Sequence, residues 1–114
     1  MPQDYNPVRQ PFLKMMQQMN VKLTGKVGKG FIIPLGPVNL VAVRTDAGMV
    51  GCGAIDVAAL DKFSYPAAKV RPAAGPSIVD IDDLLSGIVK EANRSAISRG
   101  IRNGMTGLEA LDLL

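Results

Sequence analysis

Two apolar runs on either side of a short turn give the clearest pattern in this chain. The first run, residues 40–43, is apolar at every position, which is typical of a central strand covered on both faces. The second run, residues 49–55, follows Asp46-Ala47-Gly48, a turn-forming segment whose glycine can take a positive φ. The two runs therefore predict a β-hairpin.

The second run alternates between two faces. A period of two puts Met49, Gly51, Gly53 and Ile55 on one face and Val50, Cys52 and Ala54 on the other. The two glycines leave one face bare. A bare strip indicates either close packing of a helix, which we favour, or the approach of a ligand to the backbone.

Shorter patterns extend this hairpin into a sheet. Residues 21–24 and 31–35 are strand candidates, so that the first half of the domain is predicted to be a meander of four strands. Asp56 occupies a helix N-cap position before a short helix over residues 57–63, and residues 67–70 form a fifth strand. A strand–helix–strand unit is thus expected to follow the meander.

The longest helical spacing in the sequence runs over residues 81–99 and predicts an amphipathic helix. Asp80 stands at its N-cap, and Gly87 inside it costs about 1 kcal/mol against alanine and can divide it in two. A last helix is expected to begin with a capping box at Thr106 and Glu109. These elements predict an α+β domain with a mixed, largely antiparallel sheet of about five strands and helices packed against it.

Residues 1–20 are predicted to be an N-terminal extension to a single domain of residues 21–114. Its feature is a short Met-rich helix, since Phe12, Met15, Met16 and Met19 share one helical face. That face is expected to pack on its own domain. A contact with a partner protein is the alternative, because methionine adapts to varied apolar surfaces.

The composition narrows the class of protein. A chain of 114 residues is long enough for one domain with a core of its own. One cysteine excludes an internal disulfide and favours a reducing compartment. The first residues do not resemble a signal peptide, and no apolar run reaches the roughly 18 residues that span a bilayer. We therefore predict a cytoplasmic protein with no membrane contact.

Histidine is absent from the sequence. Within one chain, this excludes Ser-His-Asp and Cys-His catalysis and every metal site that contains histidine. No metal and no cofactor are predicted. If the protein is an enzyme, the nucleophile is expected to be the thiol of Cys52, although a free cysteine among small apolar residues is more often a buried packing residue.

Charge is unevenly distributed along the chain. Residues 1–45 hold six Lys and Arg against one Asp, a balance of +5, whereas residues 46–114 hold seven against nine, a balance of −2. The basic half is expected to be a solvated edge that can contact an acidic partner. Nucleic acid is not favoured, because there are only five aromatic residues and no recognised motif. The glycine-rich loop of residues 25–30 is not a P-loop, because a strand-like run follows it.

Four segments together carry a resemblance to a known family. They are the run from Gly48 to Asp56, residues 67–70, residues 83–85, and the run Gly-Ile-Arg-Asn-Gly-Met-Thr-Gly-Leu-Glu-Ala-Leu over residues 100–111. Over residues 21–114 the chain resembles the YunC-like family of unknown function. The resemblance implies a small bacterial or archaeal α+β domain with no assigned activity, and it implies no catalytic residues.

The sequence leaves three hypotheses for function. The first is a non-catalytic module that binds a small anion or carboxylate at Gly51, Gly53, Asp56 and Arg71, with Lys69 adding charge. Against it, the Asp56 side chain would cap the helix and repel an anion. The second is assembly into a homodimer through a sheet edge or the Met-rich helix. The third is an enzyme that uses Cys52 as a nucleophile.

Overall fold

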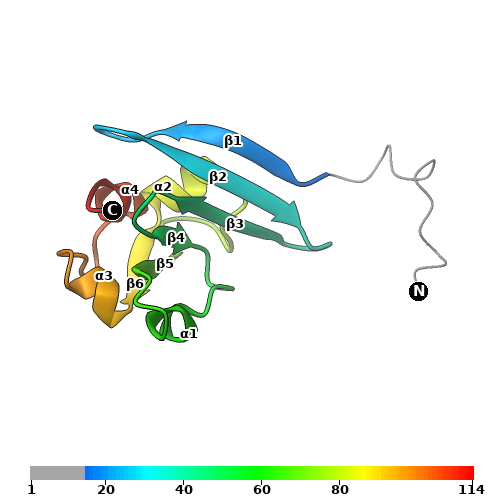
Figure 1. Cartoon of the computed structure of the whole chain (residues 1–114). Helices are drawn as coiled ribbons and strands as arrows, with labels where there is room; N and C mark the ends of the chain where they lie inside the picture. Colours follow the sequence, from blue (N-terminus) through cyan, green and yellow to red (C-terminus); the bar gives the residue numbers. More distant parts are fainter. Residues whose placement is uncertain (1–14) are drawn as a thin grey trace.

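The six strands of the sheet lie in the order in which they occur along the chain (Figure 1). The computed structural model describes residues 15–114. The strands are β1 (Gln17–Lys22), β2 (Val27–Pro34), β3 (Asn39–Arg44), β4 (Met49–Gly51), β5 (Ala67–Arg71) and β6 (Ile88–Ala92). All neighbours are antiparallel except β4 and β5, which are parallel. The α+β class and the largely antiparallel sheet are as predicted, but there are six strands instead of five.

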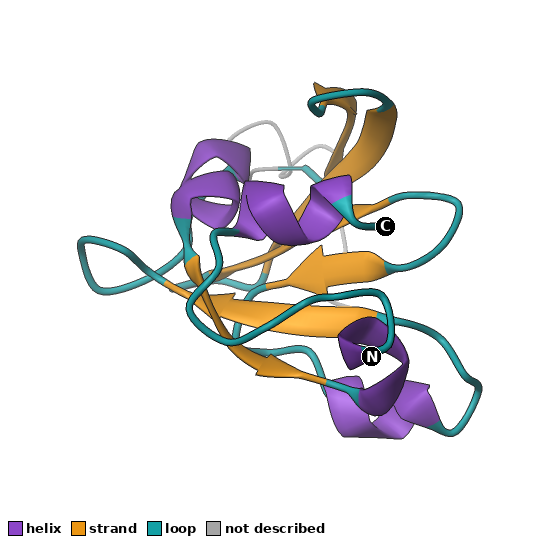
Figure 2. Ribbon diagram, turned by 90° about the vertical axis from the view of Figure 1, so that its left-hand side faces the viewer, coloured by secondary structure: helices purple, strands orange, loops and turns teal. Residues whose placement is uncertain are grey.

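Four short helices complete the domain: α1 (Val57–Asp61), α2 (Ile81–Ser86), α3 (Arg94–Ile97) and α4 (Gly107–Asp112). Figure 2 shows helices on two sides of the strands. Helix α2 packs on β2 and β3, α4 packs on β4, β5 and β6, and α1 and α3 pack against β5. The core forms where the alternating side chains of the central strands meet α2 and α4, and it includes Val41, Val43, Val50, Leu84 and Leu111, all 0% exposed. The strand predicted at residues 40–43 is therefore central.

The single helix predicted over residues 81–99 is wrong in its middle, because α2, β6 and α3 share this segment. Gly87 is the cause. Its backbone is extended, with ψ 167°, and a Cβ on it would stand 2.9 Å from the carbonyl oxygen of Arg71 and 3.0 Å from the Cβ of Val70. The chain can follow β5 at this distance only because glycine has no side chain, and the pairing makes β6 the sixth strand.

The Met-rich helix predicted over residues 12–19 is wrong where it overlaps the described residues, since Gln17–Lys22 is strand β1. Residues 12–14 lie outside the described part of the chain. Met19 packs against the core, whereas Met15 and Met16 are 68% and 54% exposed. The three methionines therefore do not form the single packed face that the helical spacing predicted. The domain boundary predicted at residue 20 falls inside β1.

The second strand of the hairpin is shorter than predicted, because β4 ends at Gly51 and a turn follows. The predicted alternation holds as far as Cys52, since Val50 and Cys52 are both buried in the core, but Ala54 lies in the turn and is exposed. Gly48 does not have a positive φ. It is required for another reason: a Cβ at this position would collide with the carbonyl oxygen of Pro66.

The predicted helix starts are confirmed. The carboxylate of Asp56 accepts a hydrogen bond from the Ala59 amide at 3.0 Å, and that of Asp80 accepts one from the Asp83 amide at 2.9 Å. Thr106 and Glu109 form the reciprocal capping box expected for α4. Within residues 15–114, no helix has the length and apolar character that crossing a membrane requires.

Candidate ligand-binding sites

The parallel pair β4 and β5 brings together two predicted site residues, Gly53 and Arg71. In the register of this pair Gly51 lies beside Lys69, and both strands run toward the same edge of the sheet. Two residues further on, Gly53 and Arg71 therefore lie on the same side of the molecule. Lys90 joins them from β6, with its Nζ 3.9 Å from the position that a Cβ on Gly53 would occupy.

These residues surround a concavity of about 270 Å³, which we call the strand-end pocket. Its walls come from five segments, and most of its lining side chains are apolar. The lining residues are Val38, Asn39, Cys52, Gly53, Ala54, Val70, Arg71, Pro72, Pro76, Ser77, Ile78 and Lys90. Asn39 fixes one rim, because its Nδ2 donates a hydrogen bond to the carbonyl oxygen of Val79 at 2.9 Å.

Two cations stand at the strand-end pocket without a carboxylate partner in the described part of the chain. Arg71 Nη1 donates only to the carbonyl oxygen of the adjacent Pro72, at 3.4 Å, and Lys90 is in no ion pair with residues 15–114. Lys69, which was expected to add charge, instead lies 3.2 Å from Glu91 and is neutralised by it. The positive charge at this site thus comes from Arg71 and Lys90.

Cys52 lines the same pocket but is only 6% exposed. Its Sγ lies 3.5 Å from the amide of Val41, which donates a weak hydrogen bond to it. A thiol in this setting fills space between strands. Among residues 15–114, no three His, Cys, Asp or Glu side chains are grouped so that they could hold a metal ion.

The structure places Gly51 and Asp56 outside the pocket. The space beside Gly51 is taken by Ile55, and the Asp56 carboxylate caps α1. Gly53 differs from Gly51, because the space beside it is open apart from Lys90, and its φ is not positive. Sequence reasoning missed Lys90 because it assigned this residue to the long helix, where it would not have faced Gly53.

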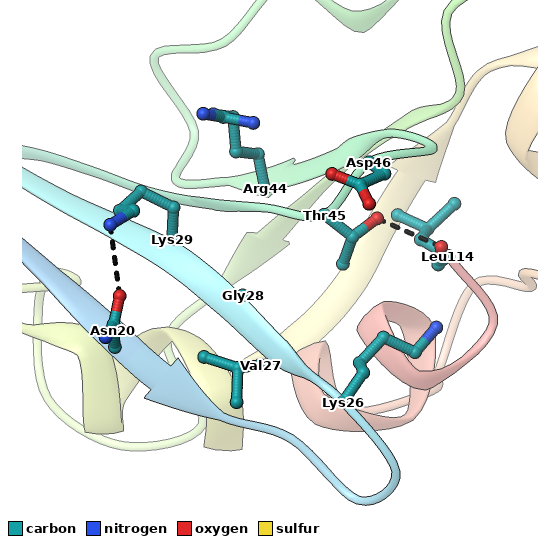
Figure 3. A pocket seen from close by; sticks show the side chains of 9 residues that line it. All are labelled: Asn20, Lys26, Val27, Gly28, Lys29, Arg44, Thr45, Asp46 and Leu114. Atoms are coloured by element: carbon teal, nitrogen blue, oxygen red, sulfur yellow. Dashed lines mark hydrogen bonds between the residues drawn. The ribbon is translucent and has the colours of Figure 1, made fainter.

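A second concavity, of about 400 Å³, lies on the β1–β3 meander, and we call it the meander depression (Figure 3). It is lined by Asn20, Lys26, Val27, Gly28, Lys29, Arg44, Thr45, Asp46 and Leu114. Three of these residues are cations and one is an acid. The uneven charge of the two halves of the sequence was the available signal for this site.

Comparison with known proteins gives three concordant results. Residues 51–114 match the family described as "Domain of unknown function (DUF1805)". The chain is 32% identical over 98 residues to the uncharacterized protein YunC of Bacillus subtilis, covering 85% of this chain and 95% of that protein. A crystal structure of a protein of unknown function from Thermoplasma acidophilum, TA1206, is 28% identical and superposes with a TM-score of 0.74, covering 86% of this chain and 91% of the other.

Proposed function

Because the chain belongs to the DUF1805 family, whose domain is of unknown function, we propose a function from the pocket itself: a non-catalytic module that binds a small carboxylic acid in the strand-end pocket. One observation carries this proposal. Two cations, Arg71 and Lys90, stand without ion-pair partners among residues 15–114 beside a largely apolar cavity. The pocket also lies mostly within the segment that matches the family.

The pocket suits an acid with a small hydrocarbon body. A carboxylate near Gly53 can meet the Lys90 ammonium, because no side chain separates them. The Arg71 guanidinium can add a forked pair of hydrogen bonds. The hydrocarbon body would lie on the wall formed by Val70 and Ile78, which are 1% and 5% exposed. A volume of about 270 Å³ limits the ligand to a small molecule.

An enzyme that uses Cys52 is the alternative. Thiol chemistry requires an accessible thiolate and a group that activates it. The sequence has no histidine, and only 6% of Cys52 is exposed. The same lining residues are better suited to binding than to catalysis. We also propose that the protein is cytoplasmic and binds no cofactor.

Titration of the full chain by amide NMR tests the binding proposal. Hexanoate should change the amide chemical shifts of Gly53, Arg71 and Lys90. Hexanol and acetate should bind more weakly, because hexanol lacks the carboxylate and acetate lacks the hydrocarbon chain. Arg71→Gln and Lys90→Gln should each lower the affinity for hexanoate about tenfold, as expected for the loss of one charge-assisted hydrogen bond. Lys62→Gln is the matched control, since Lys62 is exposed and lies outside the pocket.

Two results would contradict this proposal. One is the absence of any shift at the pocket amides in about 10 mM hexanoate, a concentration that detects millimolar affinity. The other is equal weakening by Lys62→Gln, which would mean that net charge alone decides binding. Turnover of an added thioester or ester that disappears in Cys52→Ala would instead favour the enzyme.

Assembly is a second candidate function, and the open edge of the sheet at β1 supports it. The outer edge of β6 is covered, because the Val89 amide donates to Met105 at 2.7 Å and the Gly104 amide donates to Val89 at 2.9 Å. The outer edge of β1 has no strand beside it among residues 15–114. Open edges invite pairing with another chain. We propose a homodimer through β1, and sedimentation velocity over a range of concentrations would contradict it by showing only monomer.

A further inference from the structure

We propose that the meander depression is a separate binding site for small ligands that carry several phosphate groups, such as a nucleoside di- or triphosphate or an inorganic polyphosphate. It is independent of the carboxylate proposal, because it shares no lining residue with the strand-end pocket. The two sites can therefore be tested separately.

Residues 15–45 contain four cations and no acid. Three of the cations, Lys26, Lys29 and Arg44, line the depression. None of them lies within 4.0 Å of a carboxylate in the described part of the chain, where the ion pairs are Lys69–Glu91 and Arg94–Asp61. Lys69 and Arg94 are the described cations that have a carboxylate within this distance. In the depression, the positive charge is available to an anion from solution.

The register of the meander explains why these charges are grouped. Asn20 on β1 pairs with Lys29 on β2, and Lys29 pairs with Arg44 on β3, so the three side chains form a row on one face of the sheet. Lys26 stands beyond the end of this row, where its Nζ is 3.4 Å from the main-chain oxygen of Asp112.

Figure 3 shows the three cations around the central backbone of Gly28 rather than converging on one point. A single small anion would meet one of them at a time. A ligand with several phosphates can meet two or three, and this is why we assign a multivalent class.

The groups that hold these cations are weak competitors. Lys29 Nζ donates to the neutral amide oxygen of Asn20 at 3.0 Å, and a phosphate oxygen is a stronger acceptor than an amide. Arg44 has no ion pair among residues 15–114 and can bind phosphate with two hydrogen bonds. Thr45 is not available, because its Oγ1 donates to Leu114 at 3.0 Å. Asp46 would repel phosphate, so the ligand is expected on the side of Lys29 and Arg44.

Isothermal titration of the full chain with tripolyphosphate and with orthophosphate tests this site. Tripolyphosphate should bind at least about tenfold more tightly, because it reaches more than one cation. The double variant Lys29→Gln/Arg44→Gln should weaken tripolyphosphate by about tenfold or more. Lys22→Gln/Lys62→Gln is the matched control, since it removes the same charge from two exposed residues outside the depression. The control should change the affinity by no more than about twofold.

Equal weakening by the two double variants would overturn the proposal, because it would show that only net charge matters. Equal affinities for tripolyphosphate and orthophosphate would also overturn it. Tighter binding of a single-stranded oligonucleotide than of tripolyphosphate would replace the small-ligand site with a nucleic-acid surface. Loss of hexanoate binding in Arg71→Gln with tripolyphosphate binding unchanged would confirm that the two sites are separate.

Discussion

The β1–β3 meander and the region from β4 to α3 are held together in different ways. In the meander, strands that follow one another in sequence pair with one another through ladders of backbone hydrogen bonds. In the second region, side chains far apart in sequence tie the elements together. Asn93 reaches back to Val57, 36 residues away, and Ser95 reaches Asp61, 34 residues away. Strand pairing in the meander is therefore local, and its long-range polar contacts include those made outside the strands by Thr24 with Asp112 and by Thr45 with Leu114. In the second region such contacts join the elements themselves.

The charges differ in the same way. The described part of the second region holds two acid–base pairs, Lys69–Glu91 and Arg94–Asp61, whereas residues 15–45 have four cations and no acid. The cations of the meander are therefore open to solvent anions, whereas some cations of the second region form ion pairs within the protein. This difference suggests that an exposed polar side chain in the meander can be lost at little cost to folding, whereas a buried one in the second region cannot.

The largest effect is expected at Asn93, which is 6% exposed and is the hub of the second region. Its Oδ1 accepts hydrogen bonds from the Ala96 and Ala67 amides, and its Nδ2 donates to the carbonyl oxygens of Val57 and Tyr65. Asn93→Ala removes all four of these hydrogen bonds, three of which are buried. We expect a loss of about 3 kcal/mol or more in the free energy of unfolding, measured by urea denaturation.

The matched substitution in the meander is Asn20→Ala. Asn20 is exposed, and its side chain bonds only to Lys29 among residues 15–114. We expect a change within about 0.5 kcal/mol. If the two alanine variants were equally stable, the contrast between a locally specified and a clamped region would be wrong.

For physical reasons, the sequence pattern predicted features that depend on neighbouring residues better than features that depend on pairing with distant segments. The hairpin, the helix caps and the burial of Val50 and Cys52 depend on neighbours in sequence, and all were predicted. Strand β6 was missed because Ile88, Val89 and Ala92 fit a helical period as well as a strand. Pairing with β5 decides between helix and strand here, and in this pairing Ile88 lies opposite Arg71, which is 17 residues earlier in the sequence.

The candidate site shows the same division. Gly53 and Arg71 were predicted as site residues, and the parallel register of β4 and β5 accounts for their proximity. Lys90 was not predicted, because its place in the pocket depends on β6. The acid-free segment of residues 15–45 was visible in the sequence, but the depression that it lines depends on the alignment of three strands.

An intermediate effect is expected from two glycines that are two residues apart. A Cβ on Gly51 would collide with Ile55, so Gly51→Ala should cost about 1–3 kcal/mol by overpacking. A Cβ on Gly53 would have only Lys90 nearby, and its φ is not positive. Gly53→Ala should therefore be neutral, or stabilising by up to about 1 kcal/mol, because it restricts the unfolded chain. Thermal unfolding of both variants measures the difference.

These two variants also separate packing from binding. Gly53→Ala adds a methyl group beneath Lys90 and should weaken hexanoate while the protein stays folded. A destabilised Gly53→Ala with normal hexanoate binding would contradict both the open space and the pocket assignment.

A small effect that depends on pH is expected at Asp61, which joins α1 to α3 in the second region. Hydrogen bonds from the Ser95 amide at 3.0 Å and the Ser95 hydroxyl at 2.9 Å, with a smaller contribution from the Arg94 charge, hold the pKa of the Asp61 carboxyl below its ordinary value of 3.8. A carboxyl whose pKa is lower in the folded state stabilises the fold above its unfolded pKa. This stabilisation is lost as the pH falls through the folded value. Asp61→Asn keeps an oxygen acceptor for Ser95 but removes the charge. The variant should therefore melt slightly below the parent at pH 7, and the two melting temperatures should converge as the pH is lowered from about 4 toward 2. A difference that stays constant over this range would show that the carboxylate charge does not contribute to the clamp.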